Sequence, residues 1–322
     1  MKKQRLIIPA LFVLSISLSA CNFLPNVNRS QAVNSGNNQT NQQLNNGGDE
    51  PIVDEANRTV IFGIYPQTRV TNTSLISNLE KLQPTDVGGW YCFQGTYYAK
   101  VIGKLTNTQD SQQYWSREFD DGTEIIVGNT YWFRCDPIEW DIISGDFNHH
   151  AYILRSRYLL DTHIYDEDSN NYIDSDLRFW LNNEFFYSAF AFSNFSRIRA
   201  SYVDNSASQT DSNSAELASE DTYDNVFVPS YAQLGGDNNS RNVSNTTNSD
   251  YLRYLTDYAF ATGAYNTTRD NAGFYWTRSP SGSNNNDRTV QDAWYNMDGR
   301  NWYWDVNAED IAVLPQITID MA

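Results

Sequence analysis

The first side chain with identifiable chemistry is the thiol of Cys21, which directly follows Leu18-Ser19-Ala20. Basic residues at positions 2, 3 and 5 precede an apolar run from Leu6 to Leu18. This run is shorter than the roughly 20 apolar residues that span a bilayer, and the whole order is typical of a bacterial lipoprotein signal. We therefore expect residues 1–20 to be removed and Cys21 to carry lipid on the extracytoplasmic face of the cell membrane. An uncleaved anchor is the alternative.

A second group of side chains could bind a cation. Oxygen-bearing residues alternate along the start of the segment 166–176, as they do in the first half of a calcium loop. The candidate ligands are Asp166, Asp168, Asn170 and Asp174. Asn171 stands where such loops have glycine, and Leu177 stands where they have a bidentate glutamate. We expect either a weak calcium site or a polar loop that caps the next helix, and no other cofactor.

A third group lies in the last fifty residues and combines aromatic with polar side chains. On a strand, Trp302 and Trp304 share one face while Tyr303 points the other way. Exposed indoles beside polar groups suit stacking on sugar rings, although one face of the strand could equally be core. Arg278 stands in an apolar strand and needs a partner if it is buried. The candidate ligand-binding residues are Trp276, Arg278, Trp294, Asp298, Trp302 and Trp304.

The two remaining cysteines, Cys92 and Cys135, have two possible states. A disulfide between them fits an exported protein, whereas two buried reduced thiols fit the sequence equally well. No Ser-His-Asp order, glycine-rich phosphate loop or zinc spacing is present in the sequence. We therefore assign no catalytic residue and do not expect an enzyme.

The charge of the chain limits its partners. Its formal net charge is −17, and removal of residues 1–20 takes away three positive charges and no negative one, which leaves −20. Such an acidic surface repels nucleic acid and anionic lipid headgroups. We expect no nucleic-acid partner, and contact with the membrane only through the lipid anchor.

Composition divides the chain into three parts. After the signal, residues 21–57 are rich in Asn, Gln, Ser and Gly, which predicts a flexible tether. From Arg58 the sequence becomes rich in aromatic and β-branched residues, and we expect residues 58–322 to form a single domain.

Residue patterns indicate the elements that must position these groups. A helix is expected around Leu177, Trp180, Leu181 and Phe185, capped by Asp174 or Ser175, and a second helix over 251–261 that ends near Gly263. Asp298-Gly299 predicts a two-residue hairpin. Strands are expected at 59–64, where Tyr65-Pro66 should stop the run, and at 89–103, 130–143, 151–158, 274–278, 290–297, 300–306 and 311–319 with a break at Pro315. The result is an α+β protein with short antiparallel strands, two main helices and long loops.

An ordered series of short motifs resembles a bacterial surface-lipoprotein domain of unknown function. The motifs are Phe62-Gly63-Ile64-Tyr65-Pro66-Gln67, Pro137-Ile138-Glu139-Trp140-Asp141-Ile142-Ile143, Leu160-Asp161-Thr162, Arg178-Phe179-Trp180-Leu181-Asn182, Asp224-Asn225-Val226-Phe227, Trp276-Thr277-Arg278-Ser279-Pro280, and a terminal Val306-Asn307 with Ile311-Ala312-Val313-Leu314-Pro315.

This resemblance implies a fold akin to C-type lectins and to the formylglycine-generating (sulfatase-modifying) enzymes, without an assigned activity. Those oxidases use a late cysteine pair, and this chain has no cysteine after Cys135. The expected function is therefore a surface binding module for a glycan or an extracellular protein. A formylglycine-generating-type enzyme, or a decayed relative of one, and a structural envelope lipoprotein are the alternatives.

Overall fold

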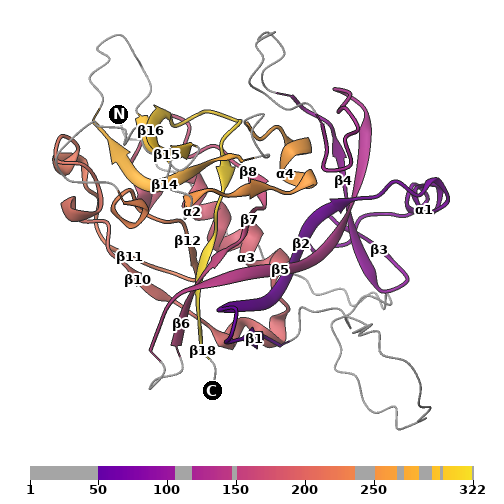
Figure 1. The fold of residues 1–322 in the computed structure, drawn as a ribbon, viewed down its shortest axis with the longest axis horizontal. Helices are drawn as coiled ribbons and strands as arrows, with labels where there is room; N and C mark the ends of the chain where they lie inside the picture. The colour runs from indigo at the N-terminus through magenta and orange to yellow at the C-terminus, as the bar shows by residue number, and fades with distance from the viewer. Residues whose placement is uncertain are drawn as a thin grey trace, which may run out of the picture.

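The computed structural model describes residues 50–105, 118–146, 151–235, 251–266, 272–282, 292–297 and 300–320. In this part of the chain the fold is mixed α+β with mostly antiparallel strands, as the sequence patterns predicted. Figure 1 shows the sheet of β14, β15 and β16 at one end of the molecule, β1 and the end of β18 at the opposite end, and β3, β4 and α1 extending to one side.

The larger sheet has nine described strands in the order β1-β2-β5-β6-β18-β12, with β4 beside β5, β3 beside β4, and β9 beside β18. Every pairing in it is antiparallel. The strands are β1 (Ile52–Asp54), β2 (Thr59–Arg69), β3 (Tyr91–Phe93), β4 (Thr96–Ile102), β5 (Thr130–Asp146), β6 (Ala151–Ser156), β9 (Ile198–Arg199), β12 (Val226–Phe227) and β18 (Gln316–Asp320).

The second sheet has five described strands in the order β16-β15-β14-β17-β8. They are β8 (Asp161–Thr162), β14 (Phe274–Ser281), β15 (Asp292–Met297), β16 (Arg300–Asp305) and β17 (Ala312–Val313). Met297 pairs with Arg300, which confirms the two-residue hairpin, although Asp298 and Gly299 themselves lie outside the described residues. Two small pairs complete the strands, β7 (Tyr158–Leu159) with β13 (Tyr254–Leu255), and β10 (Ser201–Val203) with β11 (Thr222–Asp224).

The longest described helical segment runs from Asp176 to Ala189. It comprises α2 (Asp176–Trp180), the π-helical η2 (Leu181–Phe185) and α3 (Phe186–Ala189). The side chain of Ser175 accepts a hydrogen bond from the backbone of Arg178, which confirms Ser175 as the N-cap. The other helices are α1 (Thr73–Leu79) and α4 (Asp257–Thr262), and short 3₁₀ turns occur at η1 (Tyr172–Asp174), η3 (Phe192–Arg197), η4 (Ala207–Gln209), η5 (Ala215–Leu217) and η6 (Ala232–Leu234).

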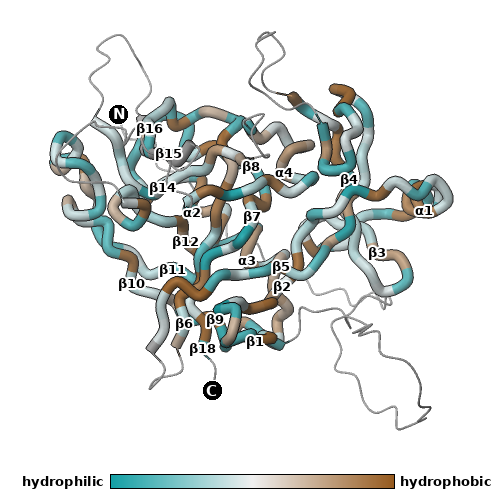
Figure 2. The backbone as a smooth tube through the Cα atoms, viewed as in Figure 1, coloured by the Kyte–Doolittle hydropathy of each residue, from teal (hydrophilic) through white to brown (hydrophobic). Residues whose placement is uncertain are grey.

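The main core joins both sheets to the helical segment. Each of its central residues is at most 1 % exposed: Phe62, Trp140 and Leu154 from the larger sheet, Leu181 and Phe185 from the helical segment, and Trp276 and Ile317 from β14 and β18. Trp180 and Leu181 are buried as predicted, with 8 % and 0 % exposure. In Figure 2 brown hydrophobic stretches follow the central strands, while the surrounding loops are mostly teal or white.

Three elements differ from the sequence prediction. β2 does not stop at Tyr65-Pro66 but continues to Arg69, with register shifts against β5 on either side of this pair. Proline has no backbone N–H group to donate to a neighbouring strand. It is tolerated at position 66 because β1 pairs with β2 only over residues 59–61, so no N–H donor is needed toward β1 at Pro66. The second helix begins at Asp257 rather than at 251, since Tyr254-Leu255 pairs with β7 instead. β1 lies inside the range predicted for the tether.

Gly63 illustrates why the first motif needs a glycine. Its φ is +74°, and a Cβ at this position would lie 2.8 Å from the carbonyl oxygen of Ala189 and 2.7 Å from the Phe190 ring. The glycine therefore allows β2 to pack closely against the end of α3. Within the described residues, no helix has the length and apolar character needed to cross a bilayer.

Candidate functional site

The six predicted ligand-binding residues divide between the core and the surface. Trp276 is fully buried, and its indole nitrogen donates a 2.9 Å hydrogen bond to the backbone of His163. Arg278 is only 3 % exposed. These two side chains therefore belong to the folded core and are not available to a ligand.

The buried Arg278 guanidinium is satisfied by neutral oxygens instead of a paired carboxylate. It donates to the backbone oxygens of Val228 and Asp204 and to the Gln233 side chain, at 2.8, 3.1 and 3.0 Å. Burial lowers the pKa of Arg278 to about 10, which still leaves it charged at neutral pH. The acidic partner expected from the sequence is thus replaced by carbonyl groups, and Arg278 holds together the loops around β12 and η6.

Trp302 and Trp304 lie on the surface. They are 37 % and 49 % exposed, and both stand on β16, which is the end strand of the second sheet. The alternation of β16 places them on one face, about 6.7 Å apart along the strand. They pair with Tyr295 and Ala293 of β15, which are buried. The two indoles therefore extend the aromatic core outward at the sheet edge. Asp298 lies outside the described residues, as does the side chain of Trp294.

Asp166 and Asn170, two of the four predicted calcium ligands, already form hydrogen bonds within the protein. One Asp166 carboxylate oxygen accepts from the backbone of Asp168 and Ser169, and the other accepts from the backbone of Asp176. Asn170 is buried and donates to the backbone of Ser281. Asp168 and Asp174 are exposed. In the described part of the chain, no three His, Cys, Asp or Glu side chains gather as a metal site. Calcium binding stays a prediction.

The predicted bridge between Cys92 and Cys135 is not formed, because Cys135 is a free thiol with 7 % exposure. β4 separates the strands that hold the two cysteines. Two strand spacings amount to about 9.5 Å, which exceeds the roughly 7 Å between Cα atoms that a disulfide allows. Burial raises the pKa of the Cys135 thiol, so this side chain is a poor nucleophile at neutral pH.

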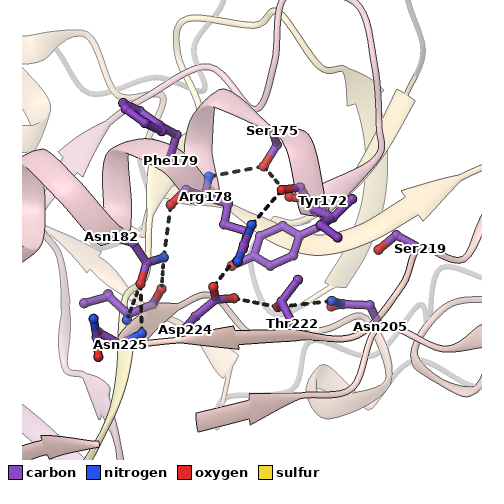
Figure 3. Close-up of polar contacts among 12 residues, drawn as sticks. Tyr172, Ser175, Arg178, Phe179, Asn182, Asn205, Ser219, Thr222, Asp224 and Asn225 are labelled. Atoms are coloured by element: carbon purple, nitrogen blue, oxygen red, sulfur yellow. Dashed lines mark hydrogen bonds and ion pairs between the residues drawn. The ribbon is translucent and has the colours of Figure 1, made fainter. Parts of the chain in front are cut away.

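A polar network joins two of the motif segments (Figure 3). Arg178 of α2 donates from Nε to Asp224 of β11 at 2.7 Å and from Nη1 to the backbone of Ile173 at 2.7 Å. Thr222 donates to the second oxygen of Asp224 at 2.7 Å. Asp224 is 1 % exposed, so this carboxylate is buried with a partner on each oxygen. The network fixes the β10–β11 pair against the start of the helical segment.

Asn182, one turn further on, joins the same helical segment to β12, as Figure 3 also shows. Its side-chain oxygen accepts from the backbone of Asn225 and Val226, and its nitrogen donates to the backbone of Val226 and Arg178. The residue is only partly exposed. Both the oxygen and the nitrogen of the side-chain amide form hydrogen bonds within the protein, so the role of Asn182 is structural.

A second contact between motifs lies deeper in the fold. Tyr65 of β2 donates a 2.6 Å hydrogen bond to Asp161 of β8. The Tyr65 ring packs against Trp90, Phe185 and Tyr258 at centroid distances of 5.7, 5.1 and 5.9 Å. Burial among these rings raises the pKa of Asp161 to about 6.

A family model described as a domain of unknown function, DUF6273, matches residues 149–319, which is more than half of the chain. The chain belongs to the DUF6273 family. The matched region contains the Arg178–Asp224 pair, Asn182, Arg278 and the exposed Trp302 and Trp304. Tyr65 and the rest of β2 precede it. No curated protein and no solved structure matches the chain.

The geometry separates two kinds of residue in this DUF6273 chain. Charged and amide side chains of the motifs are used to hold the fold together. Large aromatic side chains also lie on the surface, and several of them were not singled out from the sequence. These are Phe179, Tyr187, Phe192, Tyr202 and Tyr223, with exposures of 66, 59, 86, 58 and 71 %. Phe192 lies in the 3₁₀ turn η3, whereas the other four lie in helices or strands, and no local pattern in the sequence marked them as exposed.

Proposed function

We propose that this DUF6273 chain is a lipid-anchored extracytoplasmic binding module with a C-type-lectin-like fold, and that Trp302 and Trp304 bind a glycan. The observation that carries the proposal is the exposure of both indoles, 37 % and 49 %, on the same face of an end strand. The lectin-like character of the fold rests on the motif resemblance, and the lipid anchor rests on the signal that ends at Cys21.

The arrangement suits a sugar for two reasons. The C–H face of a sugar ring packs on an aromatic face, and two indoles about 6.7 Å apart along β16 offer consecutive contact surfaces to an oligosaccharide. In the described part of the second sheet, β16 is the end strand and has β15 as its neighbour. Asp305 follows Trp304 at the end of the strand and is partly exposed.

The negative charge of the chain disfavours anionic glycans as ligands. At a net charge of −20 after signal removal, the chain repels polyanions. Neutral oligosaccharides are therefore the proposed ligands, rather than sulfated or phosphorylated ones.

The enzyme alternative has less support. An oxidase of the formylglycine-generating type needs a reactive late cysteine, and the chain has none after position 135. Cys135 itself is buried with a raised pKa. We do not propose a catalytic role for it.

The test is a glycan array probed with the full chain carrying Cys21→Ser, which removes the lipidation site. The proposal expects neutral oligosaccharides among the bound glycans and loss of this binding in the Trp302→Ala/Trp304→Ala variant. Binding restricted to polyanionic glycans, or binding unchanged by the double substitution, would contradict it.

A further inference from the structure

A second exposed aromatic surface lies around η3. Its members are Tyr187, Phe192 and Phe195, which we call the η3 patch. Phe192 is 86 % exposed and Tyr187 is 59 % exposed. Phe195 joins them, with ring centroids 5.5 Å from Phe192 and 5.3 Å from Tyr187. The buried Phe186 supports Phe195 from below, at 4.7 Å between centroids. The three rings form one continuous apolar surface.

Folding alone does not account for the position of Phe192. At 86 % exposure the ring gives little to the core, although it stands in the 3₁₀ turn η3 between the buried Ala191 and the exposed Ser193. Clusters of exposed aromatic side chains mark contact surfaces more often than chance positions do. We therefore interpret the η3 patch as a contact surface for a binding partner.

The N-terminal segment enters the described fold beside this patch. Arg197, the last residue of η3, forms an ion pair with Glu50 at 2.5 Å. Glu50 is the first described residue and stands 29 positions after Cys21. Ile52, two residues later, is a further apolar side chain with 52 % exposure.

The length of the preceding segment limits how far this end can lie from the lipid. If this segment is the flexible tether that its composition predicts, its root-mean-square span is about 5–6 Å × √n, or about 30 Å for 29 residues. That span is shorter than the diameter of about 50 Å of a compact domain with this number of residues. The end at which the segment enters is therefore the end most often presented to the membrane.

The charge of the chain led us to expect membrane contact only through the lipid anchor. In place of that expectation, we propose that the η3 patch also lies on the surface of the lipid bilayer that holds the Cys21 anchor. The inference rests on the lipid anchor in the proposed function. Aromatic rings are favoured at the level of the headgroups, where their apolar faces leave water without entering the hydrocarbon core. The acidic chain disfavours an anionic surface, so the occupant is a zwitterionic lipid surface such as phosphatidylcholine.

This orientation has a consequence for the proposed glycan site. Figure 1 places β1, beside the patch, and β16, which carries Trp302 and Trp304, at opposite ends of the molecule. With the η3 patch on the bilayer, β16 and its two tryptophans lie at the end of the molecule away from the membrane. The patch adds a weak second contact to the lipid anchor, and two weak contacts hold a protein at a membrane better than one.

The experiment uses the lipidated full chain in phosphatidylcholine vesicles that contain a spin-labelled lipid quencher. A fluorescent thiol label is placed on Phe192→Cys in one variant and on Trp304→Cys in the matched control. Cys92, which is partly exposed, is replaced by serine in both variants, and Cys135 is buried, so the label goes to the introduced cysteine. Both sites are exposed, so neither substitution disturbs the core.

The proposal predicts quenching at position 192 that is several-fold stronger than at position 304. Equal quenching at the two positions, or none at either, would overturn it. A label at 192 that is shielded only in native membranes, and not in pure lipid vesicles, would assign the patch to a protein partner and would also overturn it. If the mass of the protein lacks acyl chains, the anchor fails, and with it this inference, whereas the glycan array reports separately on the Trp302–Trp304 site.

Discussion

The hydroxyl group of Tyr65 donates a 2.6 Å hydrogen bond to the carboxylate of Asp161, across 96 positions of sequence. This contact joins the larger sheet at β2 to the second sheet at β8. Asp161 also accepts from the backbone of Thr162 at 2.8 Å. The two sheets are thus linked by a carboxyl group that is largely removed from water, and whose protonation responds to pH near 6.

The first prediction concerns the pH dependence of stability. Burial raises the pKa of Asp161 to about 6 in the folded protein, compared with about 3.9 in an unfolded chain. Between these values the folded state binds more protons than the unfolded state, so the free energy of unfolding falls as pH rises from about 4 to 6. Asp161→Asn should remove this part of the slope, on the order of 1–3 kcal/mol, as measured by urea unfolding at several pH values.

Tyr65→Phe is the matched control for this prediction. The Tyr65 hydroxyl lowers the pKa of Asp161 by hydrogen bonding, although burial outweighs it. Its removal should therefore raise the pKa further and extend the falling slope above pH 6. Parallel stability curves for wild type, Asp161→Asn and Tyr65→Phe would show that Asp161 does not titrate in this range.

The second prediction concerns the Arg178–Asp224 ion pair. Asp224 is 1 % exposed, so Arg178→Met leaves a buried charge with Thr222 as its only side-chain partner. We expect a loss of about 3–5 kcal/mol from the free energy of unfolding. Adding Asp224→Asn should restore part of that loss, which a double-mutant cycle measures.

Arg199 provides the comparison. It forms a surface ion pair with Asp320, and its side chain is 49 % exposed. Arg199→Met should cost at most about 1 kcal/mol. If Arg178→Met cost no more than this control, the network of Figure 3 would not stabilise the fold as described.

Local patterns in the sequence predicted the parts of the structure that depend on near neighbours. Ser175 caps α2 because its hydroxyl needs only the backbone three residues ahead, and Asp298-Gly299 joins two strands that are adjacent in the chain. The stop at Tyr65-Pro66 was wrong for the opposite reason. Whether a proline ends a strand depends on which neighbours the strand has, and β5, the partner of β2, is about 70 residues away.

Distant strand neighbours also decide which of the predicted ligand-binding residues are buried and which are exposed. Strand alternation shows which tryptophans share a face, but the order of the strands decides which face is covered. Trp276 lies on β14 in the middle of the second sheet and is buried, whereas Trp302 lies on the end strand β16 and is exposed. The strand order, 16-15-14-17-8, places β17 beside β14 and β8 beside β17, and no short sequence pattern specifies this order.

The third prediction concerns calcium. If the loop over residues 166–176 binds the ion, it should do so with Kd of about 10⁻⁴–10⁻³ M, since Leu177 replaces the usual glutamate. A roughly tenfold excess of calcium over Kd would then stabilise the protein by about 1.4 kcal/mol. Asp168, which is exposed, is the informative position, because Asp168→Ala should abolish the rise in Tm without disturbing the fold.

Asp166 is unsuitable for this test, because its carboxylate already accepts backbone hydrogen bonds and its removal would destabilise the loop with or without calcium. Equal melting temperatures in chelator and in several millimolar calcium would show that the loop does not bind calcium and is held only by its internal hydrogen bonds.

The fourth prediction concerns the anchor. Cys21→Ala should move the protein from the membrane fraction to the soluble fraction, or leave the signal unprocessed, and the mass of the product should lack acyl chains. Cys135→Ala is the control, because this buried free thiol has no part in anchoring. A Cys21→Ala protein that still partitions into detergent with an unchanged mass would disprove lipid attachment at this position.

The central claim is that Trp302 and Trp304 form the ligand-binding surface, and an affinity titration tests it most directly. The ligand is a neutral oligosaccharide identified on the array, and the protein is the full chain with Cys21→Ser. Trp302→Ala/Trp304→Ala should weaken binding at least about tenfold, or 1.4 kcal/mol, with little change in Tm because both side chains are exposed. Phe192→Ala, which removes an exposed ring at the opposite end of the molecule, should leave Kd unchanged. Equal affinities for wild type and the double variant would contradict the account.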